Sequence, residues 1–350
     1  MNETIDNFNY SFSNFLENNF LAIYKFRDTK LIQLFENEMQ EKLNATTELN
    51  PEQFDFLKSY ITYQVADLKK ASHTISDNQL IEHYLQEKIL YDQPNYMLFF
   101  SHLFSKYLET NTIGLSYSKF NLLLEQPKKA ALLMEFLEKD TKLKDERLRE
   151  LVLLKIAKDV YYRSDFNQAK IKNLLEEISR SSKFIEHQKI GKTLINKLGR
   201  LSVGSVAPSF KLKNSQGASR ILKDYSGKYV YLVFSSDDCP TCELDSTSLK
   251  HIQERYTDDL RVVNIRANYH PISNPNKQYP QKIESLLFDN DFELLDTYQV
   301  KIFPYFMLLD REGKILLNPA KKPDDGMDHY LDFLIKKDLE KVQRKDLLFR

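Results

Sequence analysis

Tryptophan is absent from this chain of 350 residues, and glycine and cysteine are scarce, with eight and two residues. The low glycine content, together with 23 phenylalanines and 20 tyrosines, is typical of a compact and mostly helical protein and argues against extensive disorder. The two cysteines stand three positions apart, so no framework of disulfides holds the fold together. Whatever the cysteines do is therefore local.

An excess of one charge is also missing, since lysine plus arginine and aspartate plus glutamate both number 50. A uniformly basic surface is therefore excluded, and we expect no nucleic-acid partner. No apolar run reaches the roughly 18 residues of a membrane span, so we expect no transmembrane segment. The first residues, Met-Asn-Glu-Thr-Ile-Asp, are acidic and polar, unlike the start of a secretory signal.

A length of 350 residues predicts about two domains. Residues 1–200 read as consecutive amphipathic helices, because apolar residues recur at spacings of three, four and seven. Proline and the residue before it disfavour helix interiors, so we expect eight to ten helices. The expected breaks lie at Asn50-Pro51, at Gln93-Pro94, between residues 111 and 114, and at Gln126-Pro127. The sequence assigns no chemistry to this helical domain.

The composition changes near Ser202, and residues 201–340 form the second predicted domain, followed by a charged tail at 341–350. We expect a hairpin of residues 210–212 and 219–222, because glycine and asparagine at its turn accept a positive φ. Buried strands are predicted at residues 229–235 and 261–266, with a helix from Pro240 to about Tyr256 between them. The cysteines thus lie at the start of the helix in a strand–helix–strand unit.

The motif Cys239-Pro240-Thr241-Cys242 has the features of a redox centre. The free N–H groups and the positive dipole end of a helix lower the pKa of a thiol, so Cys239 is the better nucleophile. Cys242 lies one turn further on and can attack a mixed disulfide formed by Cys239. Pro240 suits a first helical turn, and Thr241 is one of the two residues whose surroundings help to set the redox potential.

Two other interpretations of the cysteines are a pair of ordinary buried thiols and half of a zinc site. Ordinary thiols rarely show this spacing at a strand-to-helix junction. A structural zinc site needs about four ligands, and the chain has no second cysteine pair. We therefore favour redox chemistry and expect no metal and no cofactor beyond the two cysteines.

A second signal follows about sixty residues later, where Pro304 opens an apolar strand that a turn at residues 310–313 joins to another strand. This pattern predicts an antiparallel hairpin. Taken alone, Pro304 is a proline at a strand start. After a strand-to-helix CxxC motif, we interpret it as a cis-proline that faces the cysteines.

These residues together resemble the TlpA/ResA-type thioredoxin-like family, within the broader set that includes the AhpC/TSA peroxiredoxins. The resemblance extends from about Leu201 to Lys337 and leaves the first 200 residues unexplained. It implies an α/β domain with a central mixed sheet after the all-helical domain. The matching segments are Val203-Gly204-x-x-Ala207-Pro208-x-Phe210-x-Leu212, Leu222-x-Asp224-Tyr225-x-Gly227-Lys228, the CxxC motif, Tyr298-x-Val300, Pro304 and Leu309-Asp310-x-x-Gly313-Lys314-Ile315.

The resemblance also implies roles for single residues. Cys239 would be the exposed attacking cysteine and Cys242 the resolving one. Pro304 would be the cis-proline whose preceding residue, Phe303, offers backbone groups to a substrate chain. Asp245 stands six residues beyond the first cysteine, where the family tends to carry a carboxylate that shuttles a proton to the resolving thiol. The alternative for Asp245 is an exposed acid on a helix.

The sequence departs from the family just before the first cysteine. Asp238 replaces the usual tryptophan and follows Asp237, and two nearby carboxylates oppose formation of a thiolate at Cys239. We therefore hypothesise that Asp238 tunes the centre toward reduction or isomerisation. Val233 stands where classical thioredoxins have a buried aspartate.

The resulting prediction is a thiol-disulfide oxidoreductase that exchanges disulfides with protein thiols and is served by an upstream redox partner. The family resemblance implies a location in a bacterial periplasm or cell envelope.

One alternative function is that of a peroxiredoxin-type thiol peroxidase. Ser236 matches the active-site motif of the peroxiredoxins, but Leu232 stands where that motif has a proline. Another is a partner-binding protein whose redox domain is only regulatory.

Overall fold

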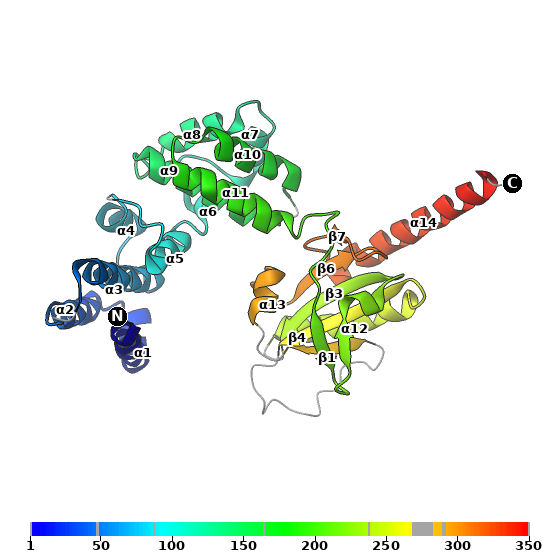
Figure 1. Cartoon of the computed structure of the whole chain (residues 1–350), viewed down its shortest axis with the longest axis horizontal. Coiled ribbons are helices and arrows are strands. Elements are labelled where there is room, and N and C mark those ends of the chain that lie inside the picture. The colour runs from blue at the N-terminus through cyan, green and yellow to red at the C-terminus, as the bar shows by residue number, and fades with distance from the viewer. Residues whose placement is uncertain are drawn as a thin grey trace. The chain divides into compact units, whose positions relative to one another are not determined.

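The computed structural model describes residues 2–46, 49–86, 88–163, 165–236, 239–267, 283–288 and 292–348 (Figure 1). The chain divides into two compact units. The first is helical and the second contains the sheet. Unit 1 comprises Met1–Tyr161 and Ala169–Thr193, and unit 2 comprises Tyr162–Gln168 and Leu194–Arg350.

Eleven helices occupy the described part of the first 200 residues, where eight to ten were expected. The difference arises from short segments such as α6, which has only four residues and follows α5 closely. The helices are α1 (Asn2–Tyr24), α2 (Thr29–Asn44), α3 (Pro51–Ala71), α4 (Asp77–Tyr84), α5 (Pro94–Leu103), α6 (Tyr107–Thr110), α7 (Tyr117–Leu124), α8 (Lys129–Glu138), α9 (Glu146–Val160), α10 (Gln168–Ser181) and α11 (Ile185–Gly199).

The proline-marked breaks are confirmed, and capping explains two of them. Asn50 is the N-cap of α3, where its side chain accepts a hydrogen bond from the backbone N–H of Gln53 at 2.9 Å. Gln93 caps α5 in the same way, directly before Pro94. A capping side chain satisfies an N–H that has no partner within the helix, and a proline at the first position needs none.

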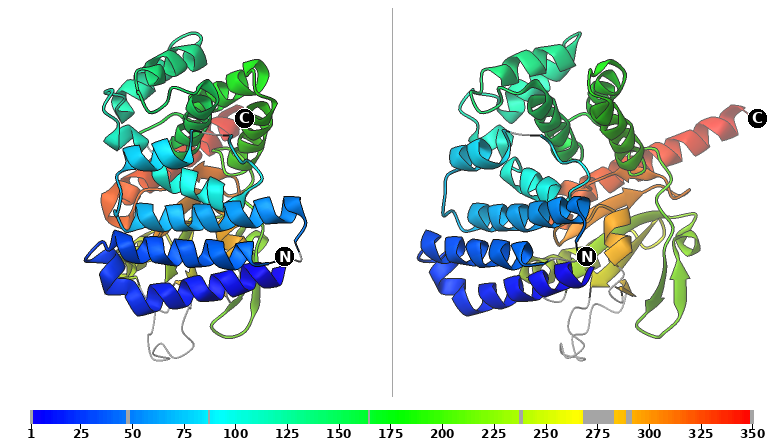
Figure 2. Two further views of the ribbon diagram at one scale, coloured as in Figure 1. Left: turned by 90° about the vertical axis from the view of Figure 1, so that its left-hand side faces the viewer. Right: turned by 60° about the vertical axis from the view of Figure 1, so that its left-hand side comes forward.

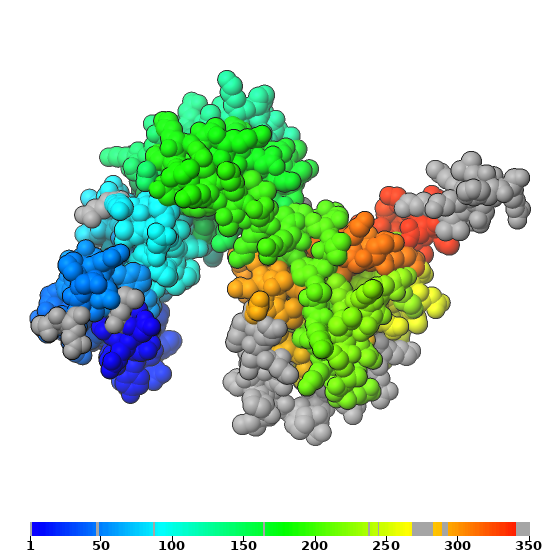
Figure 3. Space-filling model, in the orientation of Figure 1, coloured from blue at the N-terminus to red at the C-terminus, as the bar shows by residue number. Residues whose placement is uncertain are grey.

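The apolar faces of α1, α2 and α3 meet in one core. Phe8, Phe35 and Leu57 are among its buried members, one from each helix. In both views of Figure 2 these three helices, drawn in blue, lie side by side. Figure 3 shows the surface atoms of these helices in blue, in contact with one another. Tertiary packing of amphipathic faces, more than local propensity, thus holds these helices.

Unit 2 combines a sheet with helices and confirms the predicted α/β fold with a mixed sheet. Its elements are β1 (Lys211–Asn214), β2 (Ser219–Ile221), η1 (Leu222–Tyr225), β3 (Tyr229–Ser236), α12 (Pro240–Arg255), β4 (Leu260–Ala267), β5 (Glu284–Phe288), α13 (Phe292–Thr297), β6 (Tyr305–Leu309), β7 (Ile315–Leu317), η2 (Pro323–Met327) and α14 (Asp328–Leu348).

The sheet of the described residues has the strand order β2-β1-β5-β4-β3-β6-β7. Strand β4 pairs in parallel with β3 and β5, and the remaining neighbours pair antiparallel. Both predicted hairpins, β1–β2 and β6–β7, are therefore confirmed, whereas β5 and α13 were not predicted. Gly217 takes the positive φ of +79° that the first hairpin turn requires.

Different helices pack on the two faces of the sheet. On one face, residues of β3 and β4 pack against Leu249 and Ile252 of α12 and Leu331 of α14. On the other face, the sheet core includes Leu294 of α13. Side chains alternate between faces along a strand, so every second residue of β3 points toward α12. This alternation determines which residues lie beneath the cysteines.

Helix α14 continues to Leu348 and so passes through most of the stretch at 341–350 that we expected to be a charged tail. No helix among the described residues has the length and apolar character needed to cross a membrane.

Candidate functional site

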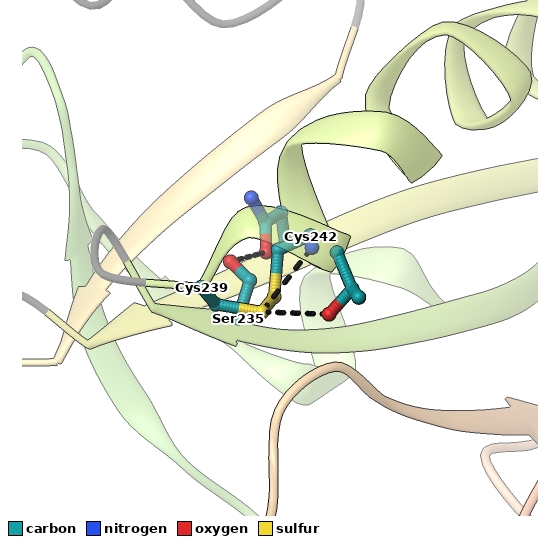
Figure 4. The surroundings of a disulfide bond; sticks show 5 residues. Ser235, Cys239 and Cys242 are labelled. Carbon is teal, nitrogen blue, oxygen red and sulfur yellow. Dashed lines mark hydrogen bonds between the residues drawn. A yellow bond between two sulfur atoms is a disulfide. The ribbon is translucent and has the colours of Figure 1, made fainter.

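Cys239 lies at the junction of β3 and α12 and is the N-cap of that helix. Its Sγ accepts a hydrogen bond from the backbone N–H of Cys242 at 3.2 Å and lies 3.3 Å from Oγ1 of Thr241 (Figure 4). The side chain is half-buried. Cys239 thus lies at the helix start, as the sequence predicted, where an N–H donor and the helix dipole would stabilise a thiolate.

Cys242 is the inner member of the pair. Its side chain is only 8% exposed, and its sulfur is bonded to that of Cys239 with the two Cα atoms 5.3 Å apart. The two residues of this disulfide are thus unequally exposed, with Cys239 the more accessible one. The two residues between them, Pro240 and Thr241, are both exposed.

A small cavity lies beneath the first turns of α12. Its volume is about 10 Å³, and it is lined by Val233, Ser235, Cys242, Asp245, Ser246, Leu249, Asn264, Ile283 and Pro304. Three residues that the sequence singled out, Cys242, Asp245 and Pro304, therefore share one cavity. The side chains of Cys242 and Asp245 reach it from the same face of α12, since they are three positions apart.

Asp245 is 9% exposed, which excludes the alternative of an exposed helix acid. Burial raises the pKa of its carboxyl above the usual range, and the charge of Asp324 raises it further, while Lys322 opposes the shift. A carboxyl group with a raised pKa holds and releases a proton closer to neutral pH than an ordinary aspartate.

The peptide bond between Phe303 and Pro304 is cis, so the predicted cis-proline is confirmed. Pro304 lies directly before β6 and borders the cavity that Cys242 also lines. Phe303 is half-buried and packs against the core of the sheet face that α13 covers. The adjacent Ile302 is 73% exposed.

Asp237 and Asp238, which we expected to tune the centre, lie outside the described residues. Among the described residues, no group of three or more histidine, cysteine, aspartate or glutamate side chains is arranged to hold a metal ion.

Sequence reasoning missed a buried polar pair in the same cavity. Ser235 of β3 donates a hydrogen bond from its hydroxyl to Oδ1 of Asn264 of β4 at 2.7 Å (Figure 4). The two side chains are only 3% and 4% exposed. The signal was present in the sequence as a polar residue within each of two apolar strands, but which partner each one meets depends on the strand register.

The arrangement suits thiol–disulfide exchange. A half-buried sulfur stands at a helix N-terminus, its partner sulfur is buried one turn further on, and a carboxyl group of raised pKa shares a cavity with that partner. A nucleophile, a resolving thiol and a proton acceptor are the groups that such exchange requires.

Comparison with known proteins agrees with this chemistry. The model of the AhpC/TSA family matches residues 203–317. The thiol-disulfide oxidoreductase ResA of Bacillus subtilis is 29% identical over 140 residues, which cover 39% of this chain and 77% of that protein. The ResA of Bacillus thuringiensis subsp. konkukian is 28% identical over 136 residues, which cover 38% of this chain and 78% of that protein.

A crystal structure of a thioredoxin-like protein from Bacteroides caccae is also similar to this chain. It covers 73% of this chain and 92% of its own, at 17% identity and a TM-score of 0.44.

Proposed function

We propose that Cys239 and Cys242 are the reacting pair of this chain and exchange disulfides with protein thiols, since its C-terminal unit is a thioredoxin-like oxidoreductase of the TlpA/ResA type. The observation that carries the proposal is the unequal burial of the two sulfurs at the start of α12. A half-buried sulfur is open to a substrate, and a buried one is reserved for the internal step.

In the reducing direction, the thiolate of Cys239 attacks one sulfur of a substrate disulfide and forms a mixed disulfide, and the first substrate thiolate leaves. Cys242 then loses its proton, and its sulfur attacks Sγ of Cys239. The Cys239–Cys242 disulfide forms, and the second substrate thiolate leaves. Two electrons have passed from the cysteine pair to the substrate, and the oxidising direction reverses each step.

Asp245 accepts the proton of Cys242 in this scheme, because it shares the cavity with that thiol and burial raises its pKa. Backbone groups of Phe303, next to the cis-proline, hold the substrate chain beside Cys239. No cofactor other than the cysteine pair takes part.

The direction that we propose is reduction or isomerisation. This part rests on Asp237 and Asp238, whose negative charges in the sequence oppose thiolate formation at Cys239. A less stable thiolate makes the dithiol form a better reductant. A redox titration of the CxxC pair checks the direction, and a potential well above that of a disulfide isomerase contradicts it.

The proposed setting is the periplasm or cell envelope of a bacterium, with folded or folding envelope proteins as substrates and an upstream redox partner that restores the cysteine pair. The similarity to the ResA proteins supports this setting.

The first prediction concerns trapping of these substrates. Cys242→Ser removes the resolving sulfur, so mixed disulfides on Cys239 persist instead of being released. We expect this variant, expressed in a bacterial envelope, to retain discrete disulfide-linked proteins that a reductant releases and mass spectrometry identifies.

Cys239→Ser is the matched control and should retain none, because only Cys239 is open to a substrate. Equal capture by both variants would show that the sulfurs do not differ in role.

A peroxidase is less well supported, because Leu232, at the position of the peroxiredoxin proline, lies fully buried inside β3. Peroxide consumption that survives Cys242→Ser but not Cys239→Ser would support it instead.

A further inference from the structure

The side chains of β3 that face α12 change from apolar to polar where the strand passes beneath the cysteines. Its residues that face α12 are Tyr229, Tyr231 and Val233, all buried in the apolar core of that sheet face. The next residue of β3 in this row of side chains facing α12 is Ser235, which is 3% exposed. An apolar row thus ends in a buried hydroxyl at the carboxyl end of the strand.

Strand β4 shows a similar change one pair earlier in the register, because Asn264 lies opposite Val233. Leu260 and Val262 belong to the apolar core beside α12, and Asn264 follows them in the row. Its amide is 4% exposed and its Oδ1 accepts the hydrogen bond from Ser235. Two neighbouring strands therefore each place a buried polar side chain on the face that α12 covers, although burial of a polar group costs free energy unless it is hydrogen-bonded.

The hydrogen bond between Ser235 and Asn264 uses only some of the donors and acceptors of the two side chains. An amide has two N–H donors, and the hydrogen bonds among the described residues include no acceptor for Nδ2 of Asn264. The hydroxyl of Ser235 also keeps lone pairs that can accept. Both residues line the cavity into which Cys242 and Asp245 face. The remaining donors and acceptors thus belong to residues that line the same cavity as Cys242 and Asp245.

The size of the cavity sets what these groups can bind. Its volume of about 10 Å³ approaches the room that one water molecule requires. A buried water makes two to four hydrogen bonds, and Ser235, Asn264 and Asp245 together offer that number. A cavity with this lining differs from an apolar void, which stays dry.

We propose that Ser235 and Asn264 position a single water molecule that carries the proton from the thiol of Cys242 to the carboxylate of Asp245. This inference rests on the proposed function. In the resolving step the S–H bond of Cys242 breaks, the water accepts that proton and passes another to Asp245. The sulfur of Cys242 bonds to Sγ of Cys239, and the substrate sulfur leaves with the electron pair of the broken disulfide. Ser235 and Asn264 touch neither reacting sulfur in this step and are positioning residues.

A matched pair of substitutions tests the role of the hydroxyl. Ser235→Val and Ser235→Thr introduce side chains of the same shape, of which only threonine keeps the hydroxyl. The reduced variants are mixed with oxidised glutathione, and acid quenching followed by mass spectrometry separates formation of the mixed disulfide from its resolution. We expect Ser235→Val to slow resolution about tenfold and to move its pH profile upward. Formation of the mixed disulfide should change less than twofold.

Ser235→Thr should restore both the rate and the pH profile of resolution. Equal resolution by the two variants across the pH range would overturn the inference and leave the proposed function intact. Failure of the unmodified chain to form any mixed disulfide through Cys239 would overturn the proposed function, and the inference with it.

A measurement on the unmodified chain does not depend on whether the variants fold. The resolution rate is followed in mixtures of light and heavy water. Transfer through one positioned water moves two protons, so the rate should vary with deuterium content along a curve. A straight line, which indicates transfer of one proton, would overturn the inference.

Discussion

The carboxyl group of Asp245 links the stability of unit 2 to its chemistry at the scale of a single residue. Burial and the charge of Asp324 raise its pKa, so the folded chain binds this proton more tightly than the unfolded chain. The free energy of unfolding therefore falls as the pH rises from the ordinary value of 3.8 toward the folded-state pKa. The stabilising effect of the bound proton is lost as the pH rises through the folded-state pKa.

Asp245→Asn should therefore have opposite effects on stability and catalysis. The amide carries no charge, so we expect a higher melting temperature than the unmodified chain at pH 7 and a similar one below pH 3.8, where both side chains are neutral. Resolution of the mixed disulfide should slow by about tenfold or more, because the proton acceptor is gone. Thermal unfolding at both pH values and the glutathione assay measure the two effects.

Glu243→Gln provides the control, since Glu243 lies on the exposed side of the same helix. It removes one negative charge close to the cysteines without altering the cavity. If Glu243→Gln reproduces both effects of Asp245→Asn, net charge near α12 and not the buried carboxyl group is responsible.

At the scale of elements, a buried hydrogen-bonded chain joins three segments of unit 1. His187 of α11 has no exposed surface. Its Nδ1 lies 2.7 Å from Oε1 of Glu150 in α9, and its Nε2 lies 2.7 Å from the hydroxyl of Tyr91, which precedes α5. Burial raises the pKa of Tyr91 to about 12, so its phenol keeps its proton at neutral pH. Each ring nitrogen of His187 thus has a hydrogen-bond partner.

His187→Ala should destabilise unit 1 by about 2–4 kcal/mol, because it removes two buried hydrogen bonds and leaves Glu150 with one partner fewer. Urea unfolding followed by circular dichroism measures the loss. His83→Ala, at an exposed position of α4, should stay within about 0.5 kcal/mol of the unmodified chain. A loss of equal size in both variants would show that the buried chain of hydrogen bonds does not stabilise these helices.

Local signals made many elements predictable from the sequence. Asn50 and Gln93 stand directly before prolines and cap the helices that follow, and the β1–β2 turn contains Gly217. The contacts of His187 were not predictable in this way, because Glu150 and Tyr91 lie 37 and 96 positions away. Their meeting depends on how α9 and α11 pack, which the apolar period alone does not specify.

In the site, too, features set by neighbouring residues were predictable and contacts between distant residues were not. The helix start and the spacing of the cysteines follow from residues close in the sequence, and the carboxyl group three positions beyond Cys242 shares its helix face. The cis-proline was predicted only in combination with the CxxC motif about sixty residues earlier. The pairing of Ser235 with Asn264 requires the parallel register of β3 and β4, in which Val233 lies opposite Asn264. Strand periodicity predicts which face a residue occupies but not its neighbour on the next strand.

At the scale of the whole molecule, the chain does not divide at one point. Unit 2 takes up Tyr162–Gln168, a segment between two helices of unit 1, in addition to Leu194–Arg350. The hydroxyl of Tyr162 donates to the carbonyl oxygen of Leu198 at 2.8 Å, and its ring packs against the apolar core of the sheet. The helical stretch of the sequence thus supplies part of the core of unit 2.

A fragment of residues 194–350 should therefore be less stable than the same unit within the whole chain. The loss of Tyr162 removes partly buried aromatic surface and a hydrogen bond, so we expect a deficit of about 2 kcal/mol. Calorimetry with and without a reductant identifies the transition of unit 2, because only this unit contains the disulfide.

Tyr162→Ala in the whole chain should lower the same transition by a similar amount and leave that of unit 1 in place. A fragment as stable as unit 2 in the whole chain would show that the segment 162–168 contributes nothing to the sheet core.

The sulfur of Cys239, for which we propose the first step of exchange, is also the acceptor at the start of helix α12, through its hydrogen bond from the N–H of Cys242. Each change in what is bonded to that sulfur therefore alters the acceptor available to one particular amide proton. Exchange of this proton with deuterium consequently follows the oxidation state of the centre from the backbone, with no dye or label attached to either thiol.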